Sequence, residues 1–262
     1  MTLGLIPTPP SLAPWGVCGA VDDSPDECLA LSSLVRRGGN QGPSQTCVWW
    51  GIAGAVYGTL QLLGLGTLWP SVRAGYYLTQ MRTHAGDRSR LVDIGCRPTD
   101  AVGVLREVGI VRDDSWPWQA IGVLDEPDMG ALITAPDRDW IRAVRLDAYG
   151  DSLRRQIQHT LSRPGREARF VVQGMAVDRA SLTWDSSRQG PYVRTGPIAG
   201  YHMELCSFYL PEGLGKVSSW GLPDRVDTWE QATGSDVTET WIVDIDEARA
   251  RKMLAGGAGW IA

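Results

Sequence analysis

The pattern of apolar positions divides the chain into a helical first part and a strand-rich second part. From Cys47 to about Leu63, apolar residues recur at helical spacing with several glycines and alanines among them. Because glycine lowers helix propensity, this helix needs burial to persist, and we expect it at the centre of a lobe. Two further helices are expected before residue 110 and a third after residue 150, over about residues 71–82, 98–108 and 151–162. Thr99 is a candidate cap for the helix at 98–108, and Gly109 is its candidate stop.

Strand patterns dominate after residue 140. Alternating or short apolar runs bounded by turn residues predict strands at about 143–149, 169–175, 201–209, 215–219 and 239–245. Helices first and strands later indicate an α+β fold with two lobes. We expect a single domain over residues 1–262, with an N-terminal arm at 1–40, a helical lobe at 41–118 and a mainly β lobe at 119–262.

Composition and charge exclude several classes of protein. The 262 residues are 43% hydrophobic and 21% charged, within the globular range, and the net charge of -5 without a basic cluster argues against nucleic-acid binding. The first residues lack the basic start and apolar run of a secretory signal, and no stretch has the length of a membrane span. We therefore expect a protein made in the cytoplasm without a signal peptide, with no nucleic acid and no membrane span among its partners.

The cysteines and histidines indicate a thiol rather than a metal site. The five cysteines cannot all pair, and structural disulfides are unusual in a cytosol. Cys18 and Cys28 bracket a short acidic loop and could form a bridge if the protein ends up outside a cell. No Cys-x-x-Cys pair is present, and the chain has three histidines. We expect neither a metal nor a cofactor.

Cys47 is the candidate nucleophile. The cysteine lies where the first helical pattern begins, six residues after Gln41. A thiol at a helix N-terminus feels the positive end of the helix dipole, which favours the reactive thiolate. We therefore expect an activated Cys47.

The spacing from Gln41 to Cys47 resembles the Gln-Gly-x-x-x-x-Cys signature of papain-like (C1) cysteine peptidases. Two other segments extend the resemblance to bacterial and phage-type members: the loop Asp93–Cys96, which leads into a helix, and the Trp-Pro-containing stretch Ser115–Trp118. The resemblance implies a two-lobed fold with a helical lobe, an antiparallel β-rich lobe and an active-site cleft between them. It also implies that the Gln41 amide and the Cys47 backbone N–H stabilise the oxyanion.

The second lobe supplies the other candidates. His202 lies two residues after Gly200 and enters an apolar strand, 155 residues after Cys47. This Gly-x-His pattern resembles the one that holds the family's catalytic histidine, which makes His202 the candidate base. The stretch from Ser218 to Gly221 is similar to the family's Asn-Ser-Trp-Gly element, with serine in the asparagine position. The resemblance implies that Ser218 orients the imidazole, less firmly than asparagine would, and that Trp220 shields this contact.

The predicted function is peptide-bond hydrolysis by a cysteine peptidase through a Cys-His acyl-enzyme, weakened by the serine, on a peptide or protein substrate. One alternative is a catalytically impaired structural or binding component of a phage particle or secreted assembly, with assembly partners and delivery in a virion. The other is a cell-wall peptide amidase or transpeptidase, which would share the acyl-enzyme and differ in the acceptor.

Overall fold

The computed structural model describes most of the chain. It covers residues 5–6, 15–16, 24–35, 39–119, 122–126, 140–181, 190–220, 222 and 224–255. The α-helices are α1 (Cys47–Leu62), α2 (Val72–Thr83), α3 (Pro98–Glu107), α4 (Gly150–Ser162), α5 (Trp229–Thr233) and α6 (Glu247–Ala255). Three short 3₁₀ turns are η2 (Ser32–Leu34), η3 (Arg88–Arg90) and η5 (Gly165–Glu167). Of the described helices, none combines the length and apolar character that a membrane crossing needs.

One twisted sheet forms the second lobe. Its strands are β1 (Trp15–Gly16), β2 (Ile141–Leu146), β3 (Phe170–Val177), β4 (Gly200–Leu210), β5 (Gly213–Val217), β6 (Arg225–Thr228) and β7 (Val237–Ile245). The spatial order is β1-β2-β7-β3-β4-β5-β6, antiparallel except for the parallel pair β1 and β2. The structure therefore has the expected α+β architecture with a helical part and an antiparallel β-rich part.

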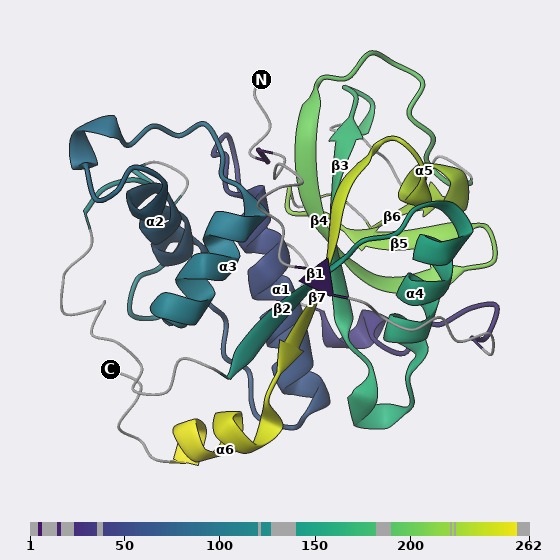
Figure 1. Ribbon diagram of the computed structural model, residues 1–262, viewed down its shortest axis with the longest axis horizontal. Helices are drawn as coiled ribbons and strands as arrows, with labels where there is room; N and C mark the ends of the chain where they lie inside the picture. Colours follow the sequence, from purple (N-terminus) through teal and green to yellow (C-terminus); the bar gives the residue numbers. More distant parts are fainter. Residues whose placement is uncertain are drawn as a thin grey trace.

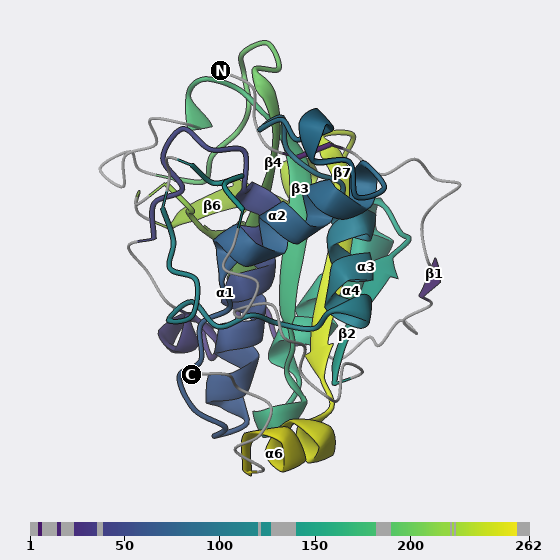
Figure 2. The same cartoon turned by 90° about the vertical axis from the view of Figure 1, so that its left-hand side faces the viewer.

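Helix α1 lies between the two parts (Figure 1). Helices α2 and α3 lie on one side of it and the strands β3, β4 and β7 on the other, and the view from the side shows α1 running along the sheet (Figure 2). Most of its residues are buried. Gly51, Gly54 and Gly58, which we call the glycine face of α1, approach side chains of β3 and β4 closely. The expectation of a buried, glycine-rich central helix is confirmed.

Several boundaries differ from the sequence predictions. Thr99 is not the cap of α3, because the helix begins at Pro98 after Arg97, and no side chain caps it. Gly109 does stop the helix: its φ is +86°, and its N–H bonds to the Val104 carbonyl. The strand expected at 143–149 is Ile141–Leu146, and the short elements β6, α5 and α6 were not predicted. Cys18 lies outside the described residues, and Cys28 is a free thiol.

Candidate active site

Cys47 is the first residue of α1 and is completely buried. Asp93 fixes the loop that leads into the helix: its carboxylate accepts hydrogen bonds from the Gln45 backbone N–H at 3.0 Å and from the Tyr76 hydroxyl at 2.8 Å. The cysteine is therefore held at a helix N-terminus, as the sequence predicted, by a carboxylate from the loop after α2.

Gln41 connects this loop to the sheet. Its side-chain amide donates to the Ser44 carbonyl at 3.0 Å, while its Oε1 accepts from the Ser219 hydroxyl at 2.8 Å. Its backbone N–H also donates to the Ser219 carbonyl at 2.7 Å. The amide group carries two hydrogens, and the Ser44 carbonyl accepts one of them, which leaves the other to serve an oxyanion.

His202 lies near the start of β4 and is also completely buried. Trp220 stacks on the imidazole with ring centroids 3.8 Å apart and an interplanar angle of 13°, so this residue lies where the sequence placed a shield. The serine that contacts the ring is Ser219, whose Oγ is 3.3 Å from Nε2. Ser218 instead accepts the backbone N–H of Trp220 at 3.1 Å. The expectation that Ser218 orients the imidazole is thus corrected: the chain direction after β5 brings the next serine to the ring.

Hydrogen-bond logic fixes the tautomer of His202. The Ser44 carbonyl can only accept, so it identifies the amide nitrogen of Gln41, and the opposite oxygen must accept from Ser219. The single hydroxyl hydrogen of Ser219 is then used, and its oxygen is left to accept from Nε2–H of His202. The other ring nitrogen, Nδ1, has no hydrogen-bond partner among the described residues and carries the lone pair that a base needs.

Cys47 meets β4 beside this histidine. The backbone of Met203, the residue after His202, hydrogen-bonds to the thiol and lowers its pKa, but burial has the larger effect and raises the pKa of Cys47 to about 12. Burial also lowers the pKa of His202 well below its usual value, and Arg225 and Lys216 lower it further. The expected activation of the thiol by the helix terminus is therefore outweighed by burial, which favours the neutral forms of both the thiol and the imidazole.

A described piece of the N-terminal arm lies against the same region. The Leu5 N–H donates to the carbonyl of Tyr201, next to His202, at 3.4 Å, and the Ile6 N–H donates to the Cys96 carbonyl at 3.0 Å. Leu5 is buried, and its side chain packs against Gly174 in β3. The arm therefore bridges the helical part and the sheet next to the candidate base.

A buried cluster of charged side chains lies behind His202, and the sequence analysis missed it. It consists of Glu204, Lys216, Arg225 and Asp227, hereafter the charge cluster. Side-chain alternation along β4 could have revealed its first member, because residues 202 and 204 share a face of a strand. Within the described part of the chain, no group of three or more His, Cys, Asp or Glu side chains is placed to hold a metal ion.

Solved structures with similar folds are cysteine proteases. No protein-family model matches the sequence, and no curated protein matches it significantly. Xylellain, a cysteine protease from Xylella fastidiosa, superposes with a TM-score of 0.74 at 15% identity, covering 93% of this chain and 96% of its own. The cysteine protease CMS1MS2 of Carica candamarcensis, solved in complex with E-64, gives 0.60 at 16% identity over 84% of this chain and 99% of its own.

Procathepsin B S9 from Trypanosoma congolense is also similar, with a TM-score of 0.64 at 12% identity over 94% of this chain and 87% of its own. At these identities the likeness concerns the path of the backbone. It agrees with the order of helices and strands described above. The chain therefore has the two-lobed α+β fold of the papain-like cysteine proteases.

Proposed function

We propose that the protein is a cysteine peptidase that hydrolyses peptide bonds through an acyl-enzyme. The observation that carries this proposal is a continuous set of contacts across the two lobes. The Cys47 thiol bonds to the backbone beside His202, and the His202 ring bonds to Ser219, which bonds to Gln41. A nucleophile, a base and an oxyanion donor are thus connected within one buried site.

Each residue has a defined role in this mechanism. Nδ1 of His202 accepts the thiol proton, and the sulfur of Cys47 attacks the carbonyl carbon of the scissile bond. The second amide hydrogen of Gln41 and the Cys47 backbone N–H, which lies in the first turn of α1 and outside the helical ladder, stabilise the oxyanion. The imidazolium then returns its proton to the leaving amine, and water hydrolyses the thioester.

Formation of the thiolate-imidazolium pair is the demanding step in this site. Both groups are fully buried, and burial favours their neutral forms. Because burial opposes the charged pair, we expect slow turnover relative to an open site of the same type. Mutual attraction between the two charges, and movement of the arm at Leu5 away from Tyr201, would both favour the charged pair.

Labelling by an electrophile tests the proposal. An epoxide of the E-64 type or iodoacetamide should modify Cys47 faster than the other described thiols, Cys28, Cys96 and Cys206. His202→Ala should lower this rate about 100-fold, because the base is lost, and Cys47→Ala should abolish hydrolysis of a denatured protein substrate. Equal rates at all four thiols would contradict an activated nucleophile.

A second candidate function is a structural or binding component of an assembly that retains the fold without turnover. The observations that favour it are the complete burial of Cys47 and His202 and the arm lying beside them. Intact protein that neither labels at Cys47 nor cleaves peptides, while binding a partner chain, would support this function. Release of new products from peptidoglycan fragments, without cleavage of denatured protein, would instead indicate an amidase or transpeptidase.

A further inference from the structure

We propose that Glu204 is a positioning residue for His202, supplying a buried carboxylate behind the imidazole in place of the family's asparagine. This inference rests on the proposed function, because it concerns the same candidate base. It adds a residue that neither the sequence motifs nor the comparisons indicate.

The geometry places the two side chains together. His202 and Glu204 lie two residues apart on one face of β4, and Oε1 of Glu204 is 3.9 Å from Nε2 of His202. Both side chains are at most 1% exposed. Nε2 is the nitrogen that faces Ser219, so the carboxylate lies on the side of the ring opposite the lone pair on Nδ1.

The rest of the charge cluster holds this carboxylate in place. The second oxygen of Glu204 accepts from Arg225 at 2.5 Å, and Arg225 also donates to Asp227 at 2.6 Å. Lys216 completes the cluster with its ammonium 3.0 Å from Asp227. A carboxylate fixed by a fully buried guanidinium has little freedom to turn away from the imidazole.

The charges explain what the carboxylate contributes. Burial raises the pKa of Glu204, while Arg225 and Lys216 lower it. With both acids ionised, two acidic and two basic side chains leave the cluster neutral, and protonation of His202 adds a positive charge to a buried site. Arg225 and Lys216 oppose this charge, whereas Glu204, with Oε1 3.9 Å from Nε2, is the carboxylate that would pair with the protonated ring. Glu204 therefore favours the imidazolium and the Nε2–H tautomer.

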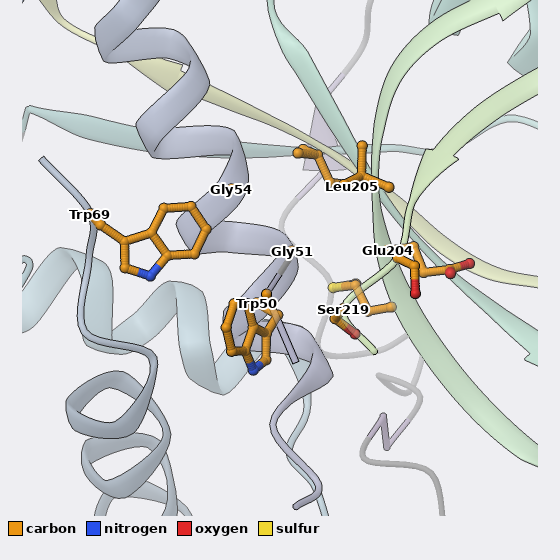
Figure 3. A pocket seen from close by; sticks show the side chains of 11 residues that line it. Trp50, Gly51, Gly54, Trp69, Glu204, Leu205 and Ser219 are labelled. Carbon is orange, nitrogen blue, oxygen red and sulfur yellow. The ribbon is translucent and has the colours of Figure 1, made fainter. Parts of the chain in front are cut away.

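The cavity that Glu204 lines is small. It lies between α1 at Gly51 and Gly54, the side chains of Trp50 and Trp69, the first half of β4 and the segment from the end of β5 to Ser219 (Figure 3). The cavity holds about 20 Å³, enough for roughly one water molecule. Because Glu204 is buried and its oxygens face His202 and Arg225, we assign it a role through the imidazole.

Cys47 reactivity at two pH values tests this assignment. The quantity measured is the iodoacetamide labelling rate of Cys47 at pH 6 divided by the rate at pH 10. In the full-length protein, Glu204→Gln should reduce this ratio about tenfold, because the loss of the carboxylate lowers the pKa of His202 by roughly one unit. Asp227→Asn removes the same charge from the cluster without touching the ring, and it should change the ratio by less than about threefold. Equal effects of the two variants would overturn the role of Glu204.

Two additions keep the test decisive. Glu204→Asp retains the charge for Arg225 but shortens the side chain, so it should fold and give a ratio between those of the wild type and Glu204→Gln. A second measurement uses NMR spectra of protein labelled with ¹⁵N-histidine, which contain signals from three residues only, His84, His159 and His202. The His202 ring should take up its proton at a lower pH in Glu204→Gln than in the wild type, whether or not the protein turns over. An unchanged His202 spectrum would overturn the inference, whereas an unreactive wild-type Cys47 would contradict only the proposed function.

Discussion

The two sides of the candidate site differ in the side chains that pack behind them. The side that carries Cys47 is helix α1, whose glycine face packs against aliphatic and aromatic side chains of β3 and β4. The side that carries His202 backs onto the charge cluster, in which every member is buried and paired. Exclusion of water has the largest effect on the pKa of both groups, and the fixed charges of Arg225 and Lys216 act on the imidazole in addition.

This difference indicates how the two groups will respond to change. Close packing tolerates little added volume, but its cost is local and does not depend on charge. In a buried ion network, replacing one charged residue by a neutral one lowers stability strongly, because its former partner stays buried without a counter-charge. Replacing both partners together costs less. Mutations on the two sides should thus differ in size and in the way they combine.

The largest effect is expected on the charged side. Lys216 is fully buried, with its ammonium 3.0 Å from Asp227. Lys216→Met leaves the cluster with an excess negative charge and should lower the free energy of unfolding by about 3–5 kcal/mol. Urea denaturation of the variant and the wild type measures this difference.

Two controls sharpen that measurement. Adding Asp227→Asn to Lys216→Met restores a neutral cluster and should recover part of the loss, which a double-mutant cycle quantifies. Arg88→Met breaks an exposed pair with Glu126 and should cost less than about 1 kcal/mol. A loss no larger for Lys216→Met than for Arg88→Met would contradict a buried network.

A smaller effect is expected on the helical side. A methyl group on Gly58 would overlap the ring of Phe170, so Gly58→Ala should cost about 1–3 kcal/mol. Gly51→Ala on the same helix meets Val172 at 3.3 Å and should be close to neutral, because the gain in helix propensity offsets the tight contact. Denaturant midpoints of the two variants compare them directly, and equal losses would show that the overlap with Phe170 is not the cause.

The sequence predicted the elements that have a strong local signal. Periodicity placed α1, α2, α3 and α4, and it placed β3, β4 and β7 within a few residues. It missed β6, α5 and α6, because a four-residue strand and helices of five and nine residues carry little periodic signal, and helices this short depend on packing for their stability. The antiparallel order of the sheet came from the family resemblance and not from the pattern.

The site was predicted in part for a similar reason. Motif spacing selected Cys47, His202 and Gln41, and the structure connects them through Ser219 and the backbone of Met203. A motif cannot show which of two adjacent serines faces a ring, since a small change in backbone path exchanges them. Likewise, the effect of burial on the thiol exceeds that of the helix dipole, and burial is a property of the folded chain.

The smallest expected effect distinguishes the two serines at the boundary between these sides. Ser219→Ala removes both the acceptor for Nε2–H of His202 and the donor to Gln41, and it should slow labelling of Cys47 about tenfold, which corresponds to roughly 1.4 kcal/mol for two buried hydrogen bonds. Ser218→Ala removes only an acceptor for the Trp220 N–H and should change the rate by less than about twofold. Second-order labelling rates at pH 6, with thermal midpoints measured in parallel, separate loss of positioning from loss of folding. A larger effect for Ser218→Ala would show that Ser218, and not Ser219, orients the imidazole as the family's asparagine does.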